Sequence, residues 1–260
     1  MPVNCPVCAR GHLRPVGEGT ERVEIELVKL FPKAKVVRVD RDTTRRRGAL
    51  EKKLEDIHAG DADILVGTQM LSKGHDFPNV TLVGVLNADQ GLYNADFRAS
   101  ERLFQQIMQV SGRAGRARKA GEVLIQTHYP NHPLFAALSR HDYNAFAEFA
   151  LAERRESSFP PFTFLALLRA ESTRSNSALT FLSAARTLGS EIADPNEVVL
   201  MDPVPAPMER RAGRYRAHLL VQSQRRSALH GFLSRWLARL NAESVKSVRW
   251  SLDVDPMDLY

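Results

Sequence analysis

Residues 61–86 read DADILVGTQMLSKGHDFPNVTLVGVL, and they contain two short apolar segments, Asp63–Gly67 and Val80–Leu86, on either side of a polar loop. Both segments are apolar without alternation, which is typical of strands buried on both faces of a parallel sheet. Two further segments of this kind are Lys35–Val39 and Glu122–Gln126. The four segments predict the strands of one parallel sheet.

Helices are predicted between these strands. The first begins with Thr20 as its N-cap, and the second carries Leu54 on its apolar face and stops at Gly60. A third precedes the last strand, and a more polar helical stretch covers 131–156. The alternation of strands and helices predicts an α/β domain whose parallel sheet is covered on both faces.

A different order begins after Ser157–Pro161, where two prolines break the chain. Beyond this break we expect a strand, a helix, two strands, a helix and a strand, over 164–170, 175–188, 198–201, 215–222, 227–241 and 245–254. The order βαββαβ is typical of a small ferredoxin-like α+β domain. The sequence therefore predicts two domains of different fold.

The composition is that of a globular protein, with 43% hydrophobic and 25% charged residues. No stretch approaches the ~18 apolar residues of a membrane span, and the first residues do not resemble a signal peptide. The chain has two cysteines, too few for a disulfide scaffold, so we expect a reducing, cytoplasmic compartment. The net charge of +6 permits a polyanionic partner without requiring one.

The segment Gln109–Arg116, QVSGRAGR, closes a predicted helix and opens a turn rich in glycine and arginine. Arg113 and Arg116 are three residues apart, so in a helical turn both guanidinium groups can reach one point. Arginine is a permanently charged, bidentate donor, which suits a phosphoryl group that gains charge in a transition state. A solvated basic helix end is the alternative, which Gln109 and the upstream parallel sheet make less favourable.

The loop Gly67–Pro78 follows the carboxyl end of a predicted parallel strand, where ligands bind in open α/β sheets. Thr68 and Lys73 suit a nucleic-acid phosphate, Gly74 gives the loop flexibility, and Asp76 suits a ribose hydroxyl. Taken alone, these residues form an ordinary polar turn. The spacing between this loop and the arginine segment favours the functional interpretation.

Six arginines and one acid lie between Glu209 and Arg226. Arg214 and Arg216 flank Tyr215 on a predicted strand, so the two arginines share one face and Tyr215 points to the other. This composition suits a nucleic-acid or acidic-peptide surface, and a solvated charged rim is the alternative.

Cys5-Pro6-Val7-Cys8 is a Cys-x-x-Cys pair, which is half of a tetrahedral zinc site. No second pair occurs, and His12 is the only further donor nearby. A surface thiol pair or a redox motif is the alternative, although a redox motif normally precedes a helix of a thioredoxin-like unit, which is not predicted here.

The segments Gly67–Pro78 and Gln109–Arg116 resemble motifs V and VI of superfamily-2 helicases, which lie in the second RecA-like lobe. Other segments make the chain similar to the PriA family of primosomal replication-restart helicases, and these are 17–21, 40–44, 86–89, 95–102, 202–207 and 252–256. The resemblance covers essentially the whole chain. It implies a RecA-like lobe 2 at 16–156, including a linker helix, then the α+β domain at 157–260, with 1–15 as the end of a zinc-binding insert.

The resemblance also implies a function, that of an ATP-dependent 3′→5′ DNA helicase which recognises stalled or abandoned replication forks and initiates primosome assembly. The implied ATP site consists of Gly74, Asp76, Gln109, Arg113 and Arg116, the last two being catalytic at the γ-phosphate. The implied DNA-binding residues are Thr68, Lys73, Arg214 and Arg216, and Cys5 and Cys8 become zinc ligands. The implied partners are forked and single-stranded DNA, single-stranded DNA-binding protein and other primosome proteins, in the bacterial cytoplasm at the nucleoid.

The sequence contains no P-loop, Gly-x-x-x-x-Gly-Lys-[Ser/Thr], and no Asp-Glu-x-His box. Without a P-loop, the phosphates of ATP and its Mg²⁺ have no cradle. We expect the P-loop of the family in a first lobe that precedes this chain, and we expect this chain alone to be inactive. A non-catalytic DNA- and protein-binding fragment and another superfamily-2 translocase are the alternatives, and the proline-rich 203–207 argues against the second.

Overall fold

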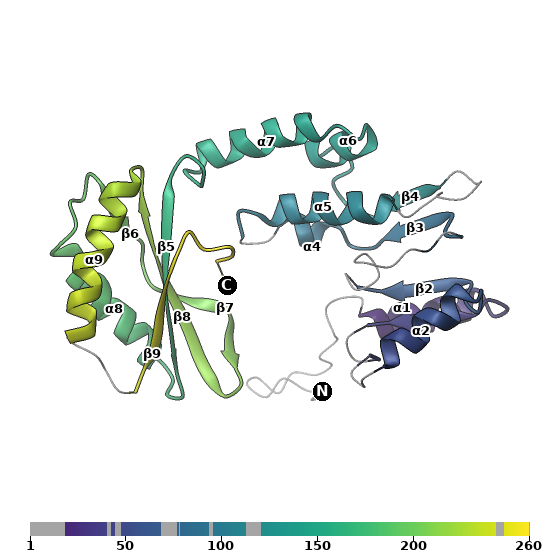
Figure 1. Ribbon diagram of the computed structural model, residues 1–260, viewed down its shortest axis with the longest axis horizontal. Helices are drawn as coiled ribbons and strands as arrows, with labels where there is room; N and C mark the ends of the chain where they lie inside the picture. The colour runs from purple at the N-terminus through teal and green to yellow at the C-terminus, as the bar shows by residue number, and fades with distance from the viewer. Residues whose placement is uncertain are drawn as a thin grey trace, which may run out of the picture. The chain divides into compact units, whose positions relative to one another are not determined.

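Figure 1 shows the chain as a computed structural model, which describes residues 19–40, 43–44, 48–68, 77, 79–93, 96–112, 121–242 and 247–259. Contacts between residues divide the chain into two compact units. The first unit is Met1–Asp89 with Leu103–Tyr129, and the second is Gln90–Arg102 with Pro130–Tyr260. This division does not follow chain order, and the predicted domain boundary after residue 156 stays a prediction.

The first unit is built from parallel strands and helices. In chain order it contains α1 (Thr20–Leu30), β1 (Val36–Val39), α2 (Ala49–His58), β2 (Ile64–Gly67), β3 (Leu82–Val85), the later part of α5 (Ala99–Ser111) and β4 (Glu122–Ile125). Strand β1 pairs with β2, and β3 pairs with β4, both in parallel as expected. Within the described residues these form two two-stranded sheets, where one continuous sheet was predicted.

Strands β3 and β4 are covered less than their apolar sequences suggest. Their residues alternate between exposed and partly buried, and Leu82 and Leu124 remain 55% and 54% exposed. The prediction that both faces of the sheet are covered is therefore wrong for this pair within the chain. An unbroken apolar run does not by itself show that protein covers both faces of a strand.

Helix α1 begins one residue earlier than predicted, with Gly19 as its N-cap. Thr20 is the first helical residue, and its hydroxyl donates a hydrogen bond of 2.7 Å to Asp40 Oδ2 at the end of β1. Because Thr20 is already inside the helix, its hydroxyl is not at the position from which a side chain caps the helix. The side chain of Thr20 instead ties the start of α1 to the turn that follows β1.

The second unit contains one antiparallel sheet. Its elements are most of α4 (Asp89–Leu92), the start of α5, α6 (Pro133–Ser139), α7 (Tyr143–Glu156), β5 (Phe164–Ser172), α8 (Ser177–Ser190), β6 (Val198–Leu200), β7 (Val204–Arg211), β8 (Arg214–Ser223), α9 (Arg226–Ala242) and β9 (Arg249–Val254). The strand order is β6-β8-β5-β9, with β7 also paired to β8, and every pairing is antiparallel. The six elements predicted beyond Pro161 are all present.

Two features of this unit differ from the prediction. Strand β7 was not predicted, because Pro205 and Pro207 interrupt its sequence, but an edge strand tolerates proline. The single helix predicted over 131–156 is two helices, α6 and α7. Asp142 starts the second by accepting a hydrogen bond of 3.0 Å from the backbone N–H of Ala145.

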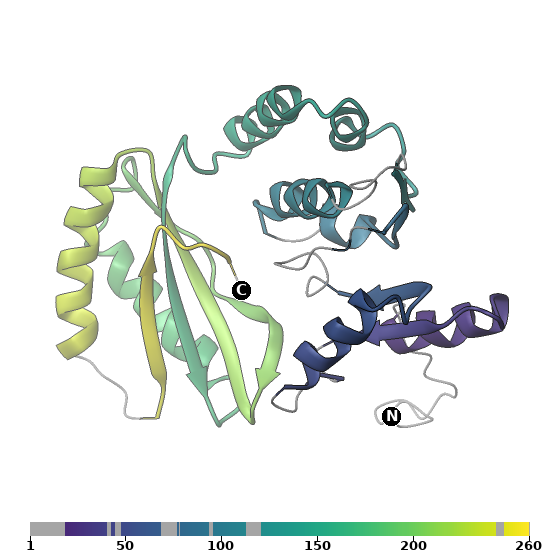
Figure 2. The ribbon, with the colours of Figure 1, turned by 45° about the vertical axis from the view of Figure 1, so that its right-hand side comes forward.

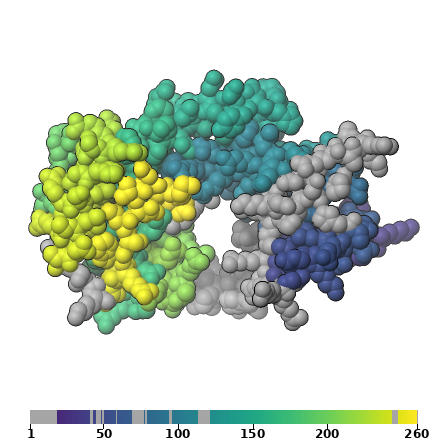
Figure 3. Space-filling view, viewed as in Figure 1, coloured from purple at the N-terminus to yellow at the C-terminus, as the bar shows by residue number. Residues whose placement is uncertain are grey.

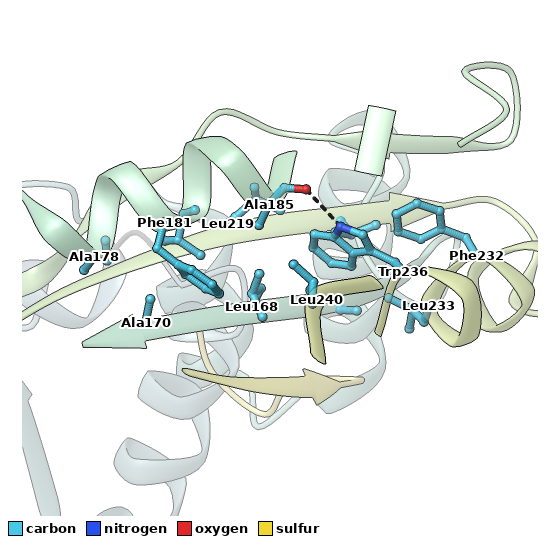
Figure 4. Close-up of a cluster of buried hydrophobic side chains, with 14 of the residues drawn as sticks. Leu168, Ala170, Ala178, Phe181, Ala185, Leu219, Phe232, Leu233, Trp236 and Leu240 are labelled. Carbon is cyan, nitrogen blue, oxygen red and sulfur yellow. Dashed lines mark hydrogen bonds between the residues drawn. The ribbon is translucent and has the colours of Figure 1, made fainter. Parts of the chain in front are cut away.

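The core of the second unit lies between the sheet and the pair α8 and α9, which Figures 1 and 2 show on the same side of the sheet. Trp236 is fully buried there and donates its indole N–H to the carbonyl of Ala185 at 2.9 Å (Figure 4). Leu168 and Leu219 face it from β5 and β8. Each buried side chain of this size contributes about 1.5–3 kcal/mol to stability, so this cluster holds the helices α8 and α9 on the sheet. The other face of the sheet is not covered by these two helices.

Over the residues that the structure describes, none of the helices combines the length and apolar character needed to cross a membrane.

Candidate nucleic-acid interface

The second face of the antiparallel sheet carries a group of arginines near the β7–β8 turn. Along β8, Ala217 and Leu219 are buried against the helices, whereas Arg214 and Arg216, at alternate positions, are only partly buried. Side chains alternate between the faces of a strand, so the two arginines share the face that points away from α8 and α9. The sequence predicted this arrangement for Arg214 and Arg216.

One carboxylate lies among these arginines. Glu171 of β5 has its Oε1 3.6 Å from Nε of Arg214 and 3.8 Å from a guanidinium nitrogen of Arg249 of β9. Glu171 is also the direct cross-strand partner of Arg216. We call Arg214, Arg216 and Arg249 the arginine cluster; around Glu171 it carries three positive charges against one negative charge.

Arg216 stands out within the cluster because, among the described residues, it makes no ion pair. It borders a cavity of about 300 Å³ that is also lined by Arg169, Glu171, His218 and Arg249, so that three arginines outweigh one carboxylate there. A guanidinium group beside an open cavity can donate two parallel hydrogen bonds to a phosphate or carboxylate group. The cavity thus suits an anionic group of a ligand.

His218 adds a neutral polar group to the cavity. Burial lowers the pKa of its imidazole, and the nearby charges of Arg169 and Arg216 lower it further. Its Nδ1 is buried and has no hydrogen-bond partner among the described residues. The imidazole therefore contributes little to the positive charge at neutral pH.

The β7–β8 turn brings a further arginine, Arg210, to the opposite face of the sheet. Ala212 and Gly213 both have positive φ angles, 49° and 79°, as a two-residue type I′ hairpin requires. Arg210 lies over the ring of Tyr215 at 5.2 Å, on the face opposite to Arg214. Tyr215 therefore has a cationic partner on its ring and lies on the face opposite to Arg214 and Arg216.

The structure describes only two of the predicted ATP- and DNA-site residues of the first unit. Thr68 is exposed directly after β2, at the carboxyl end of a parallel strand, and Gln109 is exposed near the end of α5. No hydrogen bond joins these two side chains within the described part of the chain. The other predicted residues, Lys73, Gly74, Asp76, Arg113, Arg116, Cys5 and Cys8, lie outside the described residues.

Asp40 organises the turn after β1, which the sequence pattern alone did not reveal. Its carboxylate accepts hydrogen bonds from the hydroxyl of Thr20 at 2.7 Å and from the backbone N–H of Thr43 at 2.8 Å, and Arg38 Nε lies 3.4 Å away. These contacts, above all the bond from Thr20, lower the pKa of Asp40 to about 2. An aspartate directly after a strand, with threonines three and four residues later, is the signal that could have indicated such a turn.

Asp89 makes a similar link between β3 and β4. Its carboxylate accepts hydrogen bonds from the Thr127 hydroxyl and from the backbone N–H of His128, and it lies 2.7 Å from Nδ1 of His128. The bond from Thr127 contributes most to a lowered pKa of Asp89. Asp40 and Asp89 are thus ionised residues that hold the strand ends of the first unit.

Comparison with known proteins agrees with this architecture. Residues 17–118 match the helicase conserved C-terminal domain, and residues 155–257 match the primosomal protein N C-terminal domain. The chain is therefore a helicase C-terminal domain followed by a second, α+β domain. Among solved structures, the de novo designed protein Foldit4 is similar over 36% of the chain, at 11% identity and a TM-score of 0.28.

The relatives narrow this class to one family. The chain is 46% identical to the replication restart protein PriA of Haemophilus influenzae, over 100% of the chain and 35% of that protein. It is 43% identical to PriA of Bacillus subtilis, over 98% of the chain and 32% of that protein. It is 40% identical to PriA of Synechocystis, over 100% of the chain and 31% of that protein. The chain belongs to the PriA family and corresponds to its C-terminal part; it spans about a third of the length of these relatives.

Proposed function

We propose that this chain is the C-terminal part of an ATP-dependent 3′→5′ DNA helicase that acts at stalled or abandoned replication forks and begins primosome assembly. The names of the relatives and the two domain matches support this proposal. The antiparallel sheet is proposed to be ferredoxin-like, with β7 as an addition to the βαββαβ order. Its strand order, β6-β8-β5-β9, supports that assignment.

The arginine cluster is the observation that carries the DNA-binding role. Arg214 and Arg249 pair with Glu171, and Arg216, opposite Glu171 in the sheet, makes no ion pair among the described residues and borders a cavity. Such a surface attracts the phosphates of single-stranded and double-stranded DNA without reading the base sequence. This property suits a protein that acts at forks of any sequence. Because Tyr215 lies on the other face, contact is expected through phosphates and not through base stacking.

The ATP-dependent role rests on the motif residues. Arg113 and Arg116 are proposed to contact the γ-phosphate, and Gly74, Asp76 and Gln109 to bind other parts of ATP. Thr68 and Lys73 are proposed to hold the tracked DNA strand; the exposure of Thr68 at the carboxyl end of β2 supports this. Mg²⁺ would be held mainly by the P-loop lobe, so the chain by itself is proposed to hydrolyse no ATP.

Cys5 and Cys8 are proposed to supply two of the four thiolate or imidazole ligands of a zinc ion in the intact protein. Single-stranded DNA-binding protein and other primosome proteins are proposed as partners. These assignments rest on the Cys-x-x-Cys spacing and on the family to which the chain belongs.

A titration of labelled single-stranded DNA, followed by fluorescence anisotropy at several salt concentrations, tests the DNA-binding role. Phosphate contacts release counterions, so log affinity should fall against log salt with a slope of about −0.7 for each contact. The double variant R214E/R216E should bind at least about tenfold more weakly, with a slope flatter by about 1.4, because two contacts are lost.

The matched control is R186E/R239E, which changes the net charge equally. Arg186 and Arg239 lie on α8 and α9, on the other side of the sheet, and each makes a surface ion pair of small energy. This control should bind within about twofold of the wild type. An equal loss of DNA affinity in both double variants would show that binding depends on net charge alone. Affinity that does not change with salt would show that these arginines are a solvated charged rim without phosphate contacts.

A further inference from the structure

The first turn of α5 is held by the C-terminal end of the chain. The backbone carbonyl of Met257 accepts hydrogen bonds from a guanidinium nitrogen of Arg102 at 2.7 Å and from one of Arg98 at 3.3 Å. Arg98 and Arg102 lie one helical turn apart, so both can reach the same carbonyl. We call residues 255–259 the C-terminal strap; its yellow atoms are visible at the surface in Figure 3.

The other anchor of the strap is the antiparallel sheet. Arg169 of β5 donates to the backbone carbonyl of Asp258 at 2.9 Å and to its carboxylate at 3.2 Å. Arg169 also pairs with Asp253 at the end of β9. The backbone N–H of Asp255 donates to the carbonyl of Leu165 at 2.9 Å. The strap therefore connects β5 directly to the start of α5.

The start of α5 is fixed by further contacts. Asp96, only 3% exposed, accepts a hydrogen bond from the backbone N–H of Arg98 at 2.9 Å and pairs with Arg102 at 2.8 Å. Glu101 pairs with Arg154 of α7, whose guanidinium lies 5.0 Å from the ring of Phe97. Asp96 is a buried charge and Arg154 a partly buried one, and each has a charged partner; breaking either ion pair would leave that charge without compensation, which favours this arrangement.

Helix α5 connects the contacts of its first turn to Gln109 in its last turn. It is continuous from Ala99 to Ser111, with Gln109 in its last turn, and Arg113 and Arg116 follow directly. A helix of this length, about 20 Å at 1.5 Å per residue, transmits a tilt at its first turn to its last. Anything that moves Arg98 and Arg102 therefore moves the start of the arginine segment.

Arg169 links the strap to the proposed DNA-binding face. It borders the same cavity as Arg216 and Arg249. A phosphate in that cavity would compete with the carboxylates of Asp253 and Asp258 for the guanidinium of Arg169. An anion on the sheet would thus weaken one anchor of the strap.

We infer that the C-terminal strap and Arg102 are positioning elements that couple anion binding in the cavity to the orientation of α5, and through α5 to the arginine segment. This inference rests on the proposed ATP-dependent function. A displacement of about 1 Å in a catalytic group can cost up to about 10²-fold in rate, so a loosened strap should act on turnover far more than on ATP binding.

The variants to compare are a truncation after Pro256, which removes the Met257 carbonyl and the contacts of Asp258 with Arg169, and R102M, which removes the main donor to Met257 together with the ion pair to Asp96. The control is M257A, which keeps the backbone carbonyl and removes only the exposed contact of 3.1 Å between Arg98 and the sulfur of Met257. In hydrogen exchange of the 260-residue chain, the truncation and R102M should speed exchange in the first turns of α5 about tenfold, since these amides then open locally. Amides of α8 and α9 should not change, and M257A should resemble the wild type.

The functional arm uses a protein that contains this chain together with its P-loop lobe. In the truncation and R102M the strap contact is already lost, as is expected when an anion binds in the cavity. The DNA-free kcat should therefore move toward the DNA-stimulated value, so that stimulation by DNA falls roughly tenfold or more, while the KM for ATP stays near wild type. Unchanged DNA stimulation in both variants, or unchanged exchange in α5, would overturn the coupling. Absence of ATP turnover in the wild-type protein would instead overturn the proposed function.

Discussion

Asp40 shows how one side chain holds a turn of the first unit. Its folded pKa of about 2 is below its ordinary 3.8, mainly because Thr20 donates a hydrogen bond to the carboxylate. The ionised form therefore stabilises the fold fully above the ordinary pKa, and this contribution is lost as pH falls toward 2. Asp89 has the same direction of shift, with Thr127 as its main donor.

The variant D40N should be less stable than the wild type at pH 7 by about 1.5–3 kcal/mol, the value of hydrogen bonds to a charged group. The difference should shrink as pH falls from 5 toward 2, because the wild-type carboxylate is then protonated as well. Urea unfolding of both proteins at several pH values measures this. A constant difference across that range would show that ionisation of Asp40 has no part in stability.

At the scale of elements, α8 packs unusually close to its neighbours at Gly189. A Cβ atom built at this position would lie 2.5 Å from Cδ2 of Leu200 and 3.1 Å from the indole nitrogen of Trp236. Trp236 is fixed by its bond to the Ala185 carbonyl, so the added methyl group has little space to displace it. Gly231, in the interior of α9, has no atom within 4 Å of such a Cβ.

The pair G189A and G231A separates these effects. G189A should lower stability by about 1–3 kcal/mol through overpacking, even though alanine favours a helix. G231A should raise stability by about 0.5–1 kcal/mol, because the unfolded chain loses freedom and no contact is strained. Thermal unfolding measures both. Stabilisation by both substitutions would show that Leu200 moves aside without cost.

The elements predicted from sequence were those with a clear period or a clear break. Strands of the first unit and the order beyond Pro161 follow from apolar runs and helical spacing. Strand β7 could not be found in this way, because Pro205 and Pro207 lack the backbone N–H that pairs with a neighbouring strand. Only an edge strand, which has a neighbour on one side, tolerates such residues. The N-cap at Thr20 was wrong because the helix begins at Thr20 itself, after Gly19, and the Thr20 hydroxyl donates to the distant Asp40.

In the whole molecule, the sequence predicts which site residues share one strand or loop, but not which residues of different elements meet. Arg214 and Arg216 could be placed on one face because alternation along β8 is local. Glu171 and Arg249 could not be added, since their positions depend on the register of β5 with β8 and β9. The contact of Arg102 with Met257 joins residues 155 positions apart, a distance that no sequence period indicates.

We propose that Arg113 and Arg116 of this chain complete the ATP site of a DNA helicase. DNA-stimulated ATP turnover of R116A, in a protein that contains both this chain and its P-loop lobe, tests it most directly. A charge aimed at the transferring phosphoryl group stabilises the transition state more than bound ATP. ATP binding should therefore be nearly intact while turnover falls by about 10³-fold or more, as for other arginine fingers. Wild-type turnover in R116A would contradict the account.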